Sequence, residues 1–167
     1  MKAFSELSER EILALAITSE EEDGRIYMSF AEDLAERYPA SAKLFERMSA
    51  EESRHRHLLL EQYRTRFGEH LPPIRREDVK GFLRRRPVWL TKNLPLDTIR
   101  KQAEIMEFES RRFYEKARDH TSDVGARTLL GDLAAMEHGH ELVAERIGAT
   151  TLTKTALEEE EATRNRL

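Results

Sequence analysis

The chain contains no cysteine. Disulfides, iron–sulfur clusters, cysteine zinc sites and cysteine nucleophiles are therefore excluded. Long apolar runs are also missing: no segment could cross a bilayer, and the first residues, Met1 to Glu11, lack the apolar core of a secretion signal. We therefore expect a soluble chain in a cytoplasmic environment.

Glycine and proline are scarce, with 7 and 5 residues in a chain of 167. A basic excess is absent too, since the net charge is −4, and this argues against a nucleic-acid binder. Charged residues make up 36% and hydrophobic residues 39% of the chain, a balance typical of amphipathic helices. The length is that of one domain. The composition therefore favours a single all-α domain.

Apolar periodicity and helix breakers predict four long helices. The second and third are separated by a proline-containing segment, 69–95, with a short helical candidate at 76–85. A connection this long is expected when the third helix starts back at the other end of a bundle. The sequence thus predicts two helical hairpins joined by a long crossover. The predicted helices run from Ser5 or Ser8 to Arg37, from Ser41 to Phe67, from Leu96 or Asp97 to His120, and from the turn at 121–123 to Ile147–Gly148.

One pattern of glutamate, histidine and tyrosine residues occurs twice in the sequence. A Glu-x-x-His motif occurs in the second and again in the fourth predicted helix, and one helix earlier a glutamate stands seven residues before a tyrosine. A single Glu-x-x-His arises readily by chance, so the prediction depends on the repetition along four inward stripes. The residues are Glu20 with Tyr27, Glu52 with His55, Glu107 with Tyr114, and Glu137 with His140.

These residues are suited to holding metal. Residues three apart share a helix face, so each Glu-x-x-His can approach one ion with both side chains. Carboxylates and imidazoles suit iron or manganese and also accept zinc. In ferritin-like bundles, two glutamates and two such motifs surround a pair of metal ions. We expect Glu52 and Glu137 to bridge two ions, Glu20 with His55 and Glu107 with His140 to hold one ion each, and Tyr27 and Tyr114 to hydrogen-bond these ligands.

Further candidates flank the repeated pattern. Glu104 stands three residues before Glu107, and its counterpart in the first half is the apolar Ile17. It is either a third acidic ligand or gate for a substrate ion, or a glutamate at the edge of the stripe that reaches solvent. Three other residues point away from the ligand face and are expected at the surface, an auxiliary metal role being the alternative: His57, His138 and Glu141.

Two segments lie outside the pattern. Arginines and lysines cluster within 75–86, with Trp89 following, and form either a solvated face or a contact for an anionic membrane surface. Residues 149–153 are rich in threonine and suggest a linker, while 158–161 are all glutamate and suggest either a solvated tail or the start of another helix. We therefore expect the domain to cover 1–148 and the linker and tail to cover 149–167.

With these motifs in place, residues 10–147 resemble the rubrerythrin-type ferritin-like proteins. The resemblance implies an all-α, ferritin-like four-helix bundle with a di-iron site. Rubrerythrins proper also carry a cysteine-ligated rubredoxin centre, so peroxidase chemistry fed through such a centre is not expected here. The segments that carry the resemblance are 16–20, Glu52–His55, Met106–Glu109 with Phe113–Tyr114, and Glu137–His140.

A closer likeness is to the cytoplasmic N-terminal domain of bacterial membrane-bound ferritins, in which this bundle precedes a membrane domain of the vacuolar iron transporter type. The segments 20–27 and 54–57 carry it. The resemblance implies an iron-export role at the inner face of the bacterial inner membrane, with a transporter domain in the same polypeptide. Many proteins of this type are dimers, so we also expect a homodimer.

The leading hypothesis is oxidation of Fe(II) by O2 or H2O2 at a pair of iron ions, with Mn2+ or Zn2+ as alternative occupants. A second hypothesis is a non-enzymatic metal-sensing or metal-loading dimerisation domain. A third is a helical dimerisation module without metal, which metal-independent stability would favour.

Overall fold

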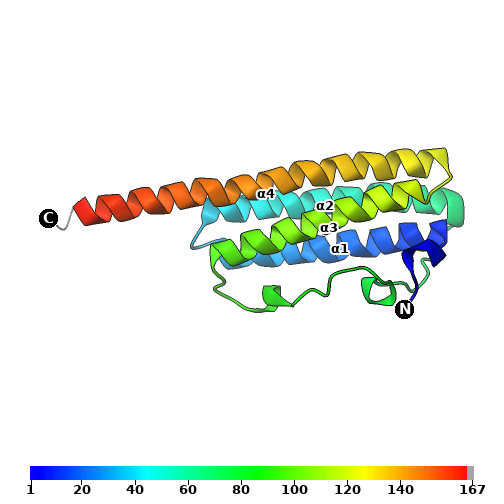
Figure 1. Cartoon of the computed structure of the whole chain (residues 1–167), viewed down its shortest axis with the longest axis horizontal. Helices are drawn as coiled ribbons and strands as arrows, with labels where there is room; N and C mark the ends of the chain where they lie inside the picture. Colours follow the sequence, from blue (N-terminus) through cyan, green and yellow to red (C-terminus); the bar gives the residue numbers. More distant parts are fainter. Residues whose placement is uncertain (165–167) are drawn as a thin grey trace.

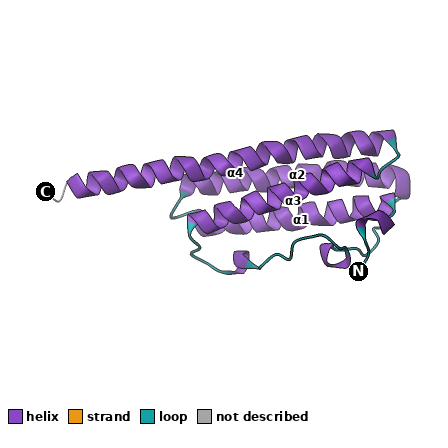
Figure 2. Ribbon diagram, in the orientation of Figure 1, coloured by secondary structure: helices purple, strands orange, loops and turns teal. Residues whose placement is uncertain are grey.

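Four long helices make up most of the computed structural model, which describes the backbone of residues 1–164 and the side chains of residues 1–146. Figure 2 shows helices and connecting loops without strands in this part of the chain. None of the described helices is both long and apolar enough to span a membrane. The elements are η1 (Phe4–Glu6), α1 (Glu9–Leu34), α2 (Pro39–Phe67), η2 (Arg76–Asp78), η3 (Val88–Leu90), α3 (Leu96–Asp119) and α4 (Val124–Arg164).

Local signals fix where the helices begin and end. Ser8 caps α1: its hydroxyl accepts a hydrogen bond from the Glu11 backbone N–H, and the Glu11 carboxylate accepts one from the Ser8 backbone. Pro39 occupies the first turn of α2, where a missing N–H costs nothing. Gly68 closes α2 with φ of 79°, a conformation that favours glycine. These ends set the lengths of the two hairpins.

The topology is that of two antiparallel hairpins joined by a crossover. In Figure 1, α2 returns along α1 and α4 returns along α3, while residues 68–95 run back along the lower edge of the bundle, below α1, to the start of α3. The start of α3 thereby lies beside the end of α1. The predicted all-α, ferritin-like class with a long crossover is confirmed.

Three predictions about these elements are wrong. The fourth helix does not end near Ile147–Gly148: α4 continues to Arg164 through the segment expected to be a linker. One glycine costs a helix only about 1 kcal/mol, and no proline follows it. The candidate helix at 76–85 is a single turn, η2, because Val79 is already extended and forms a parallel β-bridge with Lys2. Leu58 lies on the apolar stripe of the predicted helix over 41–67, which places its side chain inward, but it is 39% exposed. Residues 165–167 of the predicted tail lie outside the described residues.

The core consists of two hydrophobic clusters, one toward each end of the bundle. Burying a large apolar side chain contributes roughly 1.5–3 kcal/mol, so these clusters supply the stability of the fold. Between them the same inward stripes carry the glutamates and histidines of the repeated pattern. One cluster includes Leu13, Ile17, Leu59, Tyr63, Tyr114 and Leu133, and the other includes Ile26, Phe30, Phe45, Ile99 and Met106.

Candidate metal centre

The six predicted ligand residues meet in one layer of the bundle. Each helix contributes through residues on its inward stripe, and the three-residue spacing places each glutamate and its histidine on the same face. Five of the six are at most 4% exposed, while the His140 side chain is 14% exposed. The residues are Glu20 from α1, Glu52 and His55 from α2, Glu107 from α3, and Glu137 and His140 from α4.

Around His55, three carboxylates surround one ring nitrogen. His55 Nδ1 lies 3.1 Å from Glu137 Oε1, 3.7 Å from Glu20 Oε2 and 3.8 Å from Glu52 Oε2. One ligand atom from each of these four residues lies within 4.8 Å of all the others. The four residues therefore form one potential metal position.

A second group of four has the same construction around His140. His140 Nδ1 lies 3.3 Å from Glu107 Oε2, 3.7 Å from Glu137 Oε2 and 3.9 Å from Glu52 Oε1. Glu52 and Glu137 thus belong to both groups, and each turns a different oxygen toward each histidine. The arrangement is suited to two ions bridged by two carboxylates, as the sequence predicts.

Each of these six residues has one buried polar atom without a hydrogen-bond partner. A buried, unpaired oxygen or nitrogen costs free energy, and native proteins contain few of them. Six such atoms converging on one layer indicate that cations belong there, and mixed oxygen and nitrogen donors suit iron, manganese or zinc. The residues present therefore fit a pair of metal ions. The atoms are Glu20 Oε2, Glu52 Oε1, His55 Nδ1, Glu107 Oε2, Glu137 Oε1 and His140 Nδ1.

The pKa shifts of the buried residues also indicate that the layer is suited to cations. Burial raises the pKa values of Glu52 and Glu137 well above the usual range, and the neighbouring carboxylates raise them further. Burial alone would lower the pKa of His140, but Glu107 and Glu137 outweigh it and raise that pKa to about 10. Without a cation, the layer therefore retains protons. Divalent ions would displace them and balance the carboxylate charge.

The two predicted tyrosines do contact these glutamates, but across the hairpins. Tyr27 on α1 donates a hydrogen bond to Glu107 on α3, and Tyr114 on α3 donates one to Glu20 on α1. Burial raises the pKa of both phenols well above the usual value, so both stay protonated donors. Each tyrosine fixes the glutamate of the opposite hairpin.

The remaining candidates lie apart from the two groups. Glu104 is half-buried, and its carboxylate pairs with Arg100 one turn earlier. The placement corresponds to the stripe-edge alternative of the sequence analysis. His57 is exposed and lies 3.4 Å from Glu61. His138 is exposed and lies 3.5 Å from Glu141, which is half-buried and accepts a hydrogen bond from Arg111.

Sequence reasoning missed Glu51. Its carboxylate forms an ion-pair contact with His140 Nε2, while the other ring nitrogen, Nδ1, faces the layer. Glu51 precedes Glu52 in the chain and so points to another face of α2. No spacing rule within one helix connects it to a histidine on α4.

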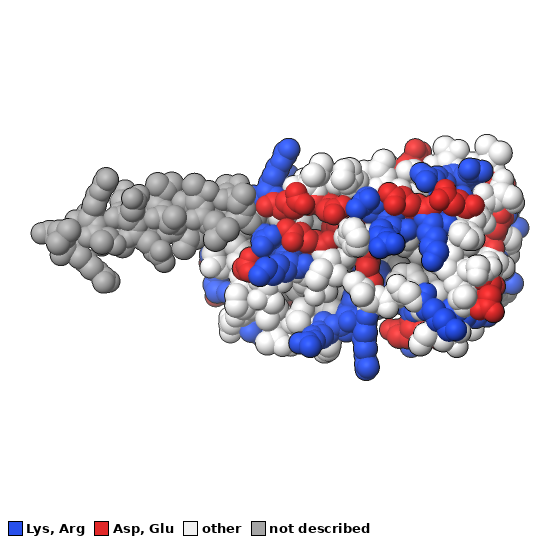
Figure 3. Space-filling view, viewed as in Figure 1, with Lys and Arg blue, Asp and Glu red and all other residues white. Residues whose placement is uncertain are grey.

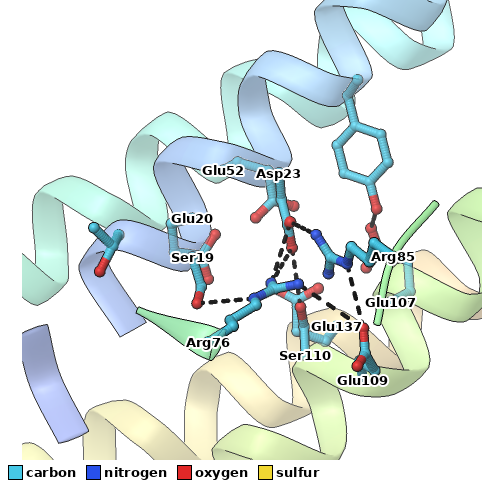
Figure 4. A network of polar contacts seen from close by, with 12 residues as sticks. Ser19, Glu20, Asp23, Glu52, Arg76, Arg85, Glu107, Glu109, Ser110 and Glu137 are labelled. Carbon is cyan, nitrogen blue, oxygen red and sulfur yellow. Dashed lines mark hydrogen bonds and ion pairs between the residues drawn. The ribbon is translucent and has the colours of Figure 1, made fainter. Parts of the chain in front are cut away.

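A buried network of charges was also missed. Asp23, three residues after Glu20, contacts Arg76 Nη2 at 3.2 Å and also pairs with Arg85, while Glu109 lies 3.3 Å from Arg85 Nε. Figure 4 shows this network beside the carboxylates of the layer. The two arginines hold the pKa of Asp23 below its usual value against the opposing effect of burial. The three-residue spacing from Glu20 could have predicted that Asp23 is also an inward-facing acidic residue in need of a cationic partner.

This network changes how the basic segment of the crossover is understood. Arg76 and the Arg85 side chain are buried against α1 and α3, so neither contributes to a solvated or membrane-facing surface. Arg75, Lys80, Arg84 and Arg86 are exposed. In Figure 3, Lys and Arg side chains project from the lower edge, along which the crossover runs in Figure 1.

On the α2 and α4 side, a groove of about 450 Å³ reaches both histidines. The crossover covers the α1 and α3 side, so the groove offers a route for solvent to the layer. Leu58, wrongly expected in the core, forms part of its wall. The lining residues are Glu51, Arg54, His55, Leu58, Met136 and His140.

Fold and site together define a ferritin-like four-helix bundle with a buried carboxylate and histidine cluster. The sequence matches the family model of rubrerythrin over residues 11–148. The chain therefore belongs to the rubrerythrin family. No curated protein sequence matches it.

Two solved structures share the fold. A hypothetical protein from Pyrococcus furiosus superposes with a TM-score of 0.71 at 21% identity, covering 90% of this chain and 94% of its own. A Thermotoga maritima protein, provisionally assigned as ferritin-like and diiron-carboxylate, superposes with a TM-score of 0.66 at 18% identity, covering 84% and 94%. At these identities the similarity establishes the fold alone.

Proposed function

We propose that the protein binds two iron ions at the buried layer and oxidises Fe(II) with O2 or H2O2. The observation that carries the proposal is the set of six unpartnered buried atoms, which fall into two groups sharing Glu52 and Glu137. Membership of the rubrerythrin family supports a di-iron occupant over other metals.

A bound pair of iron ions would supply two electrons to one oxidant molecule, one electron from each ion. Two Fe(II) become two Fe(III), and the two electrons with two protons convert H2O2 into two waters, or O2 into H2O2. The chain's own residues hold and orient the site: Glu52 and Glu137 offer an oxygen to each position, and Tyr27 and Tyr114 fix the outer glutamates. The two apolar clusters close the layer to water from both ends of the bundle, so that the groove between α2 and α4 remains as a route in.

An anaerobic titration with Fe(II), followed by admission of O2 or H2O2, tests this function. We expect two ions per chain, then growth of Fe(III) absorbance with consumption of the oxidant. Glu52→Ala should abolish both, whereas Glu104→Ala, a carboxylate outside the two groups, should change neither. Binding without oxidation would instead assign a metal-sensing or metal-loading role. Fewer than about one ion per chain, with an unchanged melting temperature, would contradict the metal site altogether.

We also propose that this bundle serves as the cytoplasmic, dimeric module of a membrane iron exporter. The support is the sequence resemblance at 20–27 and 54–57 to the soluble domain of membrane-bound ferritins. Light scattering should give the mass of a dimer. A polypeptide extended to include the membrane domain, placed in vesicles, should transport iron with intact Glu52 and lose transport in Glu52→Ala. Transport unaffected by that change would contradict the role.

A further inference from the structure

The doubled pattern is broken at the residue before each Glu-x-x-His motif. The repeat aligns Ala50-x-Glu52 with Ala135-x-Glu137. The intervening residue is Glu51 in the first half and Met136 in the second. Both residues line the groove between α2 and α4, together with His55 and His140. The two halves of the site therefore differ at equivalent places.

Of the two residues that differ, Glu51 contacts one of the site histidines, His140. The Glu51 carboxylate forms an ion-pair contact with His140 Nε2, and the Arg54 guanidinium lies 3.5 Å from Glu51. A neutral imidazole that donates through Nε2 has its lone pair on Nδ1. His140 Nδ1 is the atom that faces the layer, 3.3 Å from Glu107 Oε2. Glu51 thus orients the ring so that, once a metal ion has displaced the Nδ1 proton, the remaining proton stays on Nε2.

No such carboxylate is available to His55 at the equivalent position. Met136, on α4, is 45% exposed and carries a thioether, which is at most a weak acceptor. Outer carboxylates that hold a ligating histidine typically alter metal affinity by about 10-fold to 100-fold. The two metal positions are otherwise built alike. The break in the repeat should therefore give the His140 position a higher metal affinity than the His55 position.

We propose that Glu51 is a positioning residue that makes the two metal positions unequal. The position formed with Glu107 and His140 fills first, and the position formed with Glu20 and His55 fills second. This inference rests on the proposed metal site. Its specific content is the order of filling and the dependence of that order on a half-exposed residue that touches no ion.

Zinc is the probe, because it is diamagnetic and needs no oxidant. Titration against a chelating indicator should show two classes of site in the unaltered protein, about tenfold apart or more. Nitrogen NMR of the histidines should show zinc on His140 Nδ1, with the proton on Nε2, at the first equivalent. The Nδ1 signal of His55 should change only at the second.

Two substitutions at Glu51 distinguish orientation from simple disturbance. Glu51→Ala should weaken binding of the first zinc ion about tenfold. Glu51→Gln, whose amide oxygen can still accept a hydrogen bond from Nε2, should lose less affinity. Glu61→Ala, which changes an exposed glutamate on the same helix, is the matched control and should leave the affinity for the first zinc ion unchanged.

A gain of function completes the test. Met136→Glu should offer His55 the partner that His140 already has, tighten the second zinc ion and bring the two classes together. Equal zinc affinities in the unaltered protein and Glu51→Ala would overturn this inference while leaving the metal site intact. Failure of the unaltered protein to bind zinc would overturn the metal site as well.

Discussion

Tyr114 on α3 donates its phenolic hydrogen bond to Glu20 on α1, a residue 94 positions earlier in the chain. Tyr27 makes the reciprocal contact with Glu107 over 80 positions. Each hairpin therefore holds a ligand residue of the other. The tyrosines connect the halves through the same layer that would receive the metal ions.

Tyr114→Phe should destabilise the metal-free protein by about 1–3 kcal/mol, because it leaves the buried Glu20 oxygen without its donor. Metal affinity should also fall, by about tenfold, since a fixed ligand is lost. Denaturant unfolding and a zinc titration measure the two effects. Tyr63→Phe is the control: this buried tyrosine donates to the His70 carbonyl away from the layer, so only stability should fall. Unchanged zinc affinity in Tyr114→Phe would contradict the assigned role.

Arg85→Ala should lower the free energy of unfolding by roughly 3–5 kcal/mol, because it leaves Asp23 and Glu109 buried with one fewer cation. Urea unfolding followed by circular dichroism checks this. The neighbouring Arg84 is exposed, and Arg84→Ala should stay within about 0.5 kcal/mol of the unaltered protein. Equal effects of the two substitutions would show that the network does not hold the crossover.

Metal-free protein should lose stability as the pH rises. The pKa values of Glu52 and Glu137 are raised in the folded state above the reference value of 4.5. Their favourable contribution is therefore complete below about pH 4.5 and declines as the pH climbs toward the folded values. Zinc binding displaces these protons, so the melting-temperature gap between loaded and metal-free protein should widen from about pH 5 to about pH 8. A gap that narrows over this range would contradict the assignment.

At Glu9, near the start of α1, the pH dependence of stability should be the opposite: acid should reduce the stabilising contribution of this residue. The Ser122 backbone N–H, and also Arg66, lower the pKa of Glu9 to about 2, despite an opposing effect of burial. A lowered folded pKa contributes stability above the unfolded value of about 4.5, and this contribution is lost as the pH falls toward about 2. Glu9→Gln should therefore melt lower than the unaltered protein at about pH 7, and the difference should shrink by about pH 3. A difference that grows with acid would contradict this linkage.

Much of this arrangement is predictable because it repeats along single helices. The spacing of Glu52 to His55 and of Glu137 to His140 fixes which side chains share a face, and the length of the crossover fixes which helix ends meet. Residue spacing within one helix does not predict which side chains meet between helices. The partner of His140 on α2, and the arginines that reach Asp23 from 53 and 62 residues away, depend on tertiary packing.

Helix ends were less predictable than faces. Gly148 was expected to stop α4, yet the helix continues to Arg164, because a lone glycine is a weak terminator without a following proline. In the crossover, basic residues were expected to form one face. The structure instead buries Arg76 and Arg85 and leaves Arg75, Arg84 and Arg86 in solvent. Composition cannot separate these two environments.

The crossover has a consequence for the order of folding. Each hairpin is closed by short connections, so its contacts are local and form quickly. The arginines of the crossover find Asp23 on α1 and Glu109 on α3 only when both hairpins lie side by side. We expect the hairpins to form first, with docking and closure of the crossover as the late, slow event. Metal ions, which need ligands from all four helices, would then be captured after docking and would slow unfolding more than they speed folding.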